Sequence, residues 1–102
     1  MAVKLTALYQ KPEDEDAFMR HYTEVHMPLV QKTPHLERAT VSRVTGQPMG
    51  APSYFLVAEM VFPDQERFQE AMKSPENRAA GKDLMGFASG LVTLIVTEAI
   101  SF

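Results

Sequence analysis

The stretch YFLVAEMVF, residues 54–62, decides the fold. It is a nearly continuous run of aromatic, β-branched and aliphatic residues in which Glu59 is the only charge, so it is predicted to be a strand. The preceding segment 45–53, TGQPMGAPS, holds two glycines and two prolines and is typical of a loop. Alternate residues of the strand are apolar on both sides, which predicts that both faces of its sheet are covered.

Two helical regions accompany this strand. The first covers residues 13–33, and its acidic opening, with Asp14 or Glu13 as the N-cap, places negative charge at the partly positive end of the helix. The second covers residues 63–87 and is broken at Ser74-Pro75, because proline cannot continue the preceding helix.

Three further strands complete the pattern, at residues 3–9, 36–44 and 91–99. The resulting order β-α-β-β-α-β predicts an α+β, ferredoxin-like fold: a four-stranded antiparallel sheet with its helices on one face. We expect one domain over residues 1–102. Since the other face of the sheet is apolar to mildly polar, we expect two copies of the sheet to pack face to face in a homodimer.

Composition narrows the classes of function. The chain has 102 residues, a formal net charge of −3 and no cysteine. These features argue against nucleic-acid binding and a basic membrane-binding surface, and they exclude disulfides and thiolate catalysis. No apolar run approaches the ~18 residues of a membrane span, and the first ten residues lack the apolar core of a signal peptide. We therefore expect a cytoplasmic protein.

The segment HYTEVHMPL, residues 21–29, contains the candidate chemistry. The apolar stripe of an ideal helix here consists of Phe18, Tyr22, Val25 and Leu29. His21 and His26 flank that stripe roughly 140° apart, which argues against a shared metal ion. Pro28 should interrupt the helix near His26. Two interpretations remain. In the first, His26 is a general acid or base and Tyr22 donates a hydrogen bond to a substrate oxygen; in the second, the histidines are surface or capping residues and Tyr22 belongs to the core.

The same segment resembles the EthD family, named for ethyl tert-butyl ether degradation. The resemblance rests on Tyr9, Pro12, Asp14, Phe18, His21-Tyr22, His26, Pro28-Leu29, Pro34 and Leu36, and it is specific over residues 9–44. It implies a dimeric α+β barrel that acts in the metabolism of small organic compounds without an organic cofactor. One departure is His35, which stands where the family usually has glycine, so the turn there should be altered or should force a histidine to positive φ.

The resemblance also ranks the site residues. It favours His26 as the acid/base group, with Tyr22 stabilising an oxyanion and His21 as the second catalytic candidate. Tyr9 and Asp83 are candidates for ligand contact, although a solvated helix carboxylate is the simpler interpretation of Asp83.

Three functions fit these expectations. The first is a lyase, isomerase or dehydratase that acts on a small, hydrophobic, oxygenated compound. The second is a non-catalytic dimeric barrel that binds such a compound or serves in stress. The third is a cofactorless monooxygenase, which the absence of tryptophan disfavours because a flat aromatic pocket lacks its usual lining.

Overall fold

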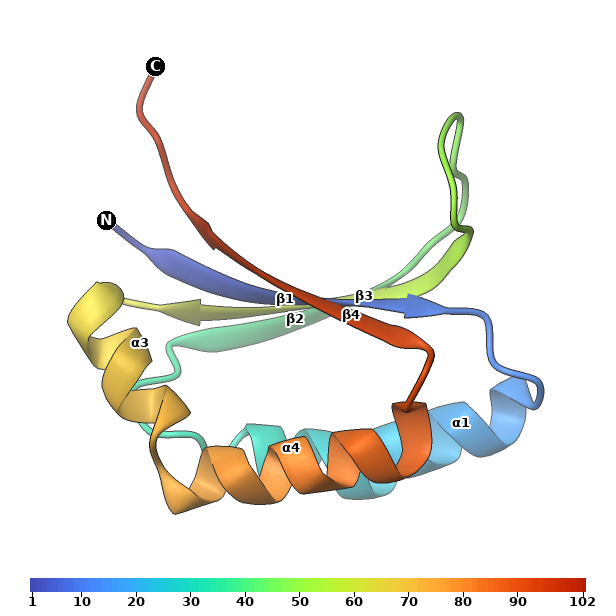
Figure 1. Cartoon of the computed structure of the whole chain (residues 1–102), viewed down its shortest axis with the longest axis horizontal. Coiled ribbons are helices and arrows are strands. Elements are labelled where there is room, and N and C mark those ends of the chain that lie inside the picture. The colour runs from blue at the N-terminus through green and yellow to red at the C-terminus, as the bar shows by residue number, and fades with distance from the viewer.

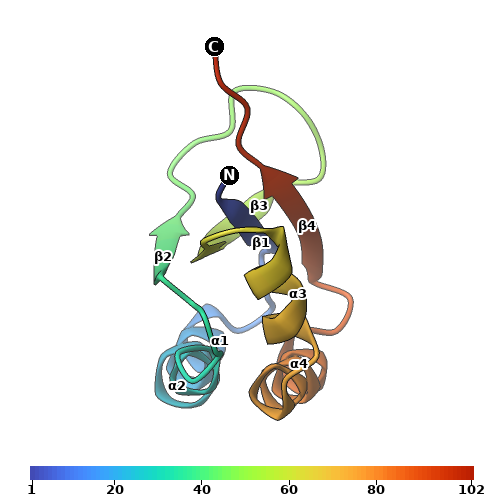
Figure 2. The same cartoon turned by 90° about the vertical axis from the view of Figure 1, so that its left-hand side faces the viewer.

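A computed structural model describes all 102 residues and shows one antiparallel sheet of four strands. The strands are β1 (Val3–Gln10), β2 (Arg38–Arg43), β3 (Tyr54–Phe62) and β4 (Val92–Glu98), in the order β2-β3-β1-β4. The ferredoxin-like fold and all four predicted strands are therefore confirmed, with small shifts at the strand ends. The sheet does not close on itself, and β2 and β4 are its edges (Figure 2).

The helices lie together on one face of the sheet (Figure 1). They are α1 (Glu15–His21), η1 (Tyr22–His26), α2 (Met27–Val30), α3 (Gln65–Met72) and α4 (Pro75–Ala88). The α1–α2 segment runs below β2 and α4 runs below β4 (Figure 2). No helix is both long and apolar enough to cross a membrane.

Side-chain caps explain where three of these helices begin. Asp14, one of the two predicted caps, accepts a hydrogen bond from the backbone N–H of Ala17 at 3.0 Å. Asp64 accepts from the N–H of Arg67 at 2.8 Å at the start of α3. Ser74 caps α4, immediately before Pro75, so the predicted break at Ser74-Pro75 separates α3 from α4.

The middle of the first helical region is a π-helix, η1, and this changes which side chains are buried. The N–H of Met27 donates to the carbonyl of Tyr22, five residues earlier. The wider turn precedes Pro28, which has no N–H to donate and whose ring clashes with an ordinary α-helical carbonyl. The predicted interruption near His26 is thus present as a wider turn.

The wider turn moves His26 and Val30 into the positions that an ideal helix assigns to Val25 and Leu29. Phe18, Tyr22, His26 and Val30 are buried at a regular spacing of four residues. Val25 is 41% exposed, and the prediction that it belongs to the core stripe is wrong. Leu29 is only partly buried.

The core between the helices and the sheet contains a cluster of aromatic rings. The ring of Phe18 lies 5.5 Å from that of Tyr9, 6.0 Å from that of Tyr22 and 5.3 Å from that of Phe87. Edge-to-face and offset contacts of this kind stabilise the core beyond simple burial of area. They fix α1 against both the sheet and α4.

The turn after α2 contains the unusual His35. Its φ is +65°, so the histidine adopts the left-handed conformation that glycine usually occupies, as the sequence suggested. Its Nε2 lies 2.9 Å from Oε2 of Glu70 on α3. This hydrogen bond ties the strained turn to the second helical region.

The face of the sheet that carries no helices is of mixed character. Its apolar members on the three strands β1, β3 and β4 are Leu8, Val57, Val61 and Ile95. Lys4 and Glu59 form an ion pair across the same face at 3.7 Å. No helix of the chain lies over this face (Figure 1).

The π-turn predicts different effects for two identical substitutions. We expect Val25→Ala to change the free energy of unfolding by less than about 0.5 kcal/mol, because the side chain is exposed. We expect Val30→Ala to cost about 2 kcal/mol, because a buried side chain is truncated. Urea unfolding measures both, and a larger cost at Val25 than at Val30 would contradict the π-turn register.

Candidate active site

The carboxylate of Asp83 joins the two histidines. Its Oδ1 and Oδ2 lie 2.9 and 3.1 Å from Nε2 of His21, and Oδ2 lies 3.1 Å from Nδ1 of His26. The expectation that the histidines diverge is therefore wrong, because the five-residue π-turn brings residues five apart to the same side of the helix. The argument that divergent histidines cannot share a metal ion therefore no longer applies. In this structure the two ring nitrogens are hydrogen-bonded to the carboxylate of Asp83.

Asp83 is not a solvated helix carboxylate. Its side chain is 18% exposed, and it lies on α4 facing the η1 turn. The hydrogen bonds to both imidazoles connect the two helical regions of the fold. No sequence pattern links residue 83 to residues 21 and 26, which are about sixty positions away.

The environment of His26 holds it in its neutral form at neutral pH. Burial lowers the pKa of His26, while the hydrogen bond to Asp83 and the charge of that carboxylate act in the opposite direction. Nδ1–H therefore donates to Asp83, and the lone pair is on Nε2. Nε2 has no hydrogen-bond partner. Every fully buried side-chain nitrogen or oxygen in the chain has one, so Nε2 cannot be fully buried. Nε2 is thus accessible.

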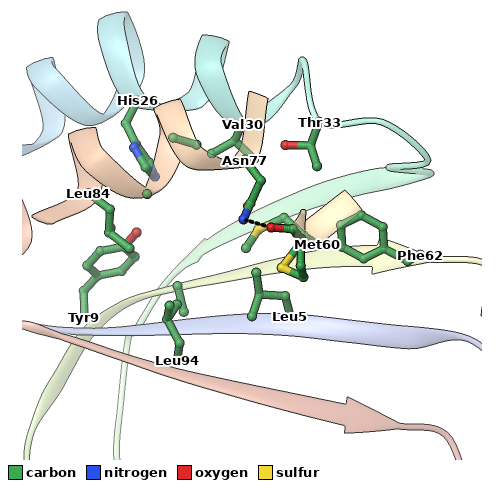
Figure 3. A pocket seen from close by; sticks show the side chains of 14 residues that line it. Leu5, Tyr9, His26, Val30, Thr33, Met60, Phe62, Asn77, Leu84 and Leu94 are labelled. Carbon is green, nitrogen blue, oxygen red and sulfur yellow. Dashed lines mark hydrogen bonds between the residues drawn. The ribbon is translucent and has the colours of Figure 1, made fainter. Parts of the chain in front are cut away.

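The space beside His26 is a cavity of about 160 Å³ between the sheet and the helices (Figure 3). A cavity of this size can hold a molecule about as large as benzene. Ten of its fourteen lining residues are hydrophobic, Tyr9 with its polar hydroxyl among them. The other polar side chains in the lining are those of His26, Thr33 and Asn77. No Lys, Arg, Asp or Glu lines it.

The two tyrosines have different positions relative to this cavity. Tyr9 lines it, whereas Tyr22 does not and instead packs edge to face against Tyr9 with ring centres 5.6 Å apart. Burial, reinforced by neighbouring Tyr22, raises the pKa of Tyr9. Burial raises the pKa of Tyr22 to about 12. Both hydroxyls stay protonated, and Tyr9 is the one that can donate to a ligand in the cavity.

His21 lies at the outer end of the hydrogen-bonded group. Its side chain is 36% exposed and borders a separate surface groove with Phe87. Of the five residues singled out from the sequence, three therefore form one hydrogen-bonded group: His21, His26 and Asp83. His26 and Tyr9 reach the cavity, and Tyr22 supports them from the core.

Sequence reasoning missed two polar residues of the cavity, Thr33 and Asn77. Asn77 precedes the buried residues Ala80, Leu84 and Ala88 of α4 at helical spacing, and this pattern could have identified it. Thr33 follows the last turn of α2, where a polar residue before Pro34 carries no comparable signal.

Comparisons with known proteins identify the family of this chain. The model of the EthD domain matches residues 10–90, and the chain belongs to the EthD family. An uncharacterised 11.0 kDa protein from the thcB-thcC intergenic region of Rhodococcus erythropolis is 34% identical over 95 residues, which cover 93% of this chain and 92% of that protein.

Solved structures extend the comparison. An EthD family protein from Bacillus halodurans shares 46% identity with a TM-score of 0.91, covering 98% of this chain and 100% of that one. A dimeric ferredoxin-like protein of unknown function from Jannaschia sp. has 12% identity and a TM-score of 0.75, covering 97% and 100%. The latter likeness shows the fold alone.

The neutral, buried His26 predicts a loss of stability in acid. Below the unfolded pKa of about 6.5 the unfolded chain binds a proton on this side chain that the native chain does not, because burial lowers its native pKa. The contribution of neutral His26 to the free energy of unfolding is fully present above pH 6.5. It is lost as the pH falls from 6.5 toward the lowered pKa of the native state. Urea unfolding between pH 7.5 and 5 should therefore show a steeper decline for the wild type than for His26→Asn.

The matched control for this measurement is His35→Asn, which removes an exposed histidine outside the cavity. It should keep the decline that belongs to His26. Equal slopes for the wild type and His26→Asn would contradict the assignment.

Proposed function

We propose that this EthD-family chain is an enzyme that uses His26 as a general base on a small, neutral, carbonyl-containing compound. The observation that carries the proposal is that the two ring nitrogens of His26 have different surroundings. Nδ1 is held by Asp83 at 3.1 Å, and Nε2 is unpartnered beside an apolar cavity. A carboxylate that orients one imidazole nitrogen leaves the other as a base of fixed direction.

The proposed step is proton abstraction next to a carbonyl group. Nε2 of His26 takes the proton, and the electron pair of the C–H bond becomes the C=C bond of an enolate. The carbonyl oxygen gains the negative charge, and the hydroxyl of Tyr9 donates a hydrogen bond to it. The imidazolium is stabilised by Asp83, and return of the proton to carbon or loss of a leaving group completes an isomerase or lyase cycle.

The environment suits each role in this step. The lowered pKa of His26 keeps it neutral and able to accept a proton near pH 7. The raised pKa of Tyr9 keeps its hydroxyl protonated as a donor. The proposal therefore assigns to Tyr9 the donor role that the sequence suggested for Tyr22, which does not line the cavity.

Exchange of α-protons for deuterium in cyclohexanone tests the chemistry, and NMR in deuterium oxide follows it. We expect His26→Asn, which keeps a donor toward Asp83 but lacks a base, to lose about 100-fold in the catalysed rate. We expect Tyr9→Phe to lose a similar factor. Tyr54→Phe is the matched control and should stay near the wild-type rate, because the same change is made at a tyrosine that does not line the cavity.

Other outcomes of this assay have definite meanings. Unchanged exchange in His26→Asn would remove the mechanism. Saturable binding with no exchange by the wild type would favour the non-catalytic binding barrel. Uptake of oxygen with a phenolic compound would favour the oxygenase.

We also infer that the chain works as a homodimer through the open face of its sheet. Leu8, Val57 and Ile95 lie on that face among neutral threonines, and Ile95 is 42% exposed. Dimeric proteins share the fold, which supports pairing of the open faces. Such packing would cover apolar side chains that one chain leaves in water.

Val57→Lys tests this inference, since a buried charge at a sheet-to-sheet contact is unfavourable. Light scattering should give a dimer for the wild type and a monomer for Val57→Lys. Thr23→Lys, which adds the same charge on an exposed helical position, should remain dimeric. A monomeric wild type at micromolar concentration would contradict the inference.

A further inference from the structure

The cavity has a second polar end that the proposed chemistry does not use. In Figure 3, His26 and Tyr9 lie at one end, while Thr33 and Asn77 lie toward the other, with apolar side chains between and around them. A cavity lined mainly by apolar groups uses its few polar groups to orient a ligand. Two polar groups remote from the base therefore need an explanation of their own.

Asn77 is held in place by the start of α4. Its backbone N–H donates to the hydroxyl of Ser74 at 3.1 Å, and its side-chain Nδ2 donates to the carbonyl of Met72 at 3.2 Å. The hydroxyl of Ser74 is itself fixed by donating to the carbonyl of Ala71 at 2.6 Å. These bonds orient the amide and leave its oxygen and its second N–H without a partner in the chain.

Thr33 offers a second free group. Its backbone N–H donates to the carbonyl of Val30 at 3.0 Å, but its hydroxyl makes no hydrogen bond. The residue is only 9% exposed and lines the cavity. Because no side-chain oxygen in the chain is both fully buried and unpartnered, the hydroxyl of Thr33 must reach accessible space.

The lining also limits the charge and size of the ligand. It contains no cationic side chain for an anion and no carboxylate for a cation, so an uncharged molecule fits best. The volume of about 160 Å³ corresponds to about six to eight non-hydrogen atoms. Gly81 keeps this room open on α4, where an added Cβ would meet no atom within 4 Å.

We propose that Thr33 and Asn77 bind a second, uncharged oxygen group of the substrate, at the end remote from His26. The substrate class is then a neutral, monocyclic or similarly compact molecule with a carbonyl at one end and a hydroxyl or carbonyl at the other. The assignment of the carbonyl to the His26 end rests on the proposed function. The assignment of the second oxygen to Thr33 and Asn77 rests on their free hydrogen-bonding groups alone.

Two probes of nearly equal shape test the second end: 4-hydroxycyclohexanone and 4-methylcyclohexanone. Dissociation constants come from NMR titration of the wild-type protein at pH 7. We expect the hydroxyl probe to bind about tenfold more tightly, since the methyl probe leaves Thr33 and Asn77 unpaired. Equal affinities, or no saturable binding of the hydroxyl probe, would overturn the proposal.

Variants assign the preference to particular groups. Thr33→Val keeps the shape but removes the hydroxyl, and it should lower the tenfold preference to about threefold or less, as should Asn77→Leu. Thr33→Ser keeps a hydroxyl and should retain the preference. The comparison of Thr33→Val with Thr33→Ser therefore tests the proposal even if Asn77→Leu fails to fold. Thr23→Val, the same change at an exposed position outside the cavity, should have no effect. A full preference in folded Thr33→Val and Asn77→Leu would overturn the proposal.

Exchange of cyclohexanone, which has no second oxygen, separates this proposal from the proposed function. Thr23→Val, which lies outside the cavity, should leave its saturated exchange rate within about twofold of the wild type. If His26→Asn exchanges normally while the hydroxyl preference persists, the proposed function fails and the second binding end stands. If the preference is absent while exchange depends on His26, only the second binding end fails.

Discussion

The hydrogen bonds of Asp83 to His21 and His26 are the contacts on which the candidate site depends. They join α4 to the η1 turn, and they decide which nitrogen of His26 remains free. Without the carboxylate, the buried imidazole would lose its tautomeric preference and its orientation toward the cavity. The two helical regions would also lose a polar connection in a core that is built mainly from apolar side chains.

The cavity imposes a cost that packing alone would avoid. Apolar side chains that line unfilled space lose the packing contacts that a filled core would give them. Larger side chains at Ala80 or Gly81 on α4 could reduce that volume, and both positions instead hold small residues. Leu94, which is 49% exposed, borders the same cavity, so the opening lies along the edge strand β4. An open, apolar space beside a free imidazole nitrogen is what a small ligand requires.

The π-turn connects the backbone to the chemistry. Pro28 withholds a backbone donor, and the preceding turn takes one residue more than an α-helical turn. That additional residue turns His26 inward and Val25 outward. Π-turns of this kind often occur at functional sites because they change the direction of one side chain without ending the helix.

The sequence by itself determined the strands, the helix caps and the order of elements, because these follow from local patterns of apolar, capping and turn residues. It also offered His26, Tyr22, His21 and Tyr9 as candidate site residues, whereas Asp83 was more simply interpreted as a solvated helix carboxylate. Only the tertiary structure decided that Asp83 bonds both histidines and that Tyr9 rather than Tyr22 reaches the cavity. The physical reason is that an ideal-helix projection assumes 3.6 residues per turn. The π-turn breaks that assumption, and contacts between α4 and η1 depend on packing across the core rather than on spacing along the chain.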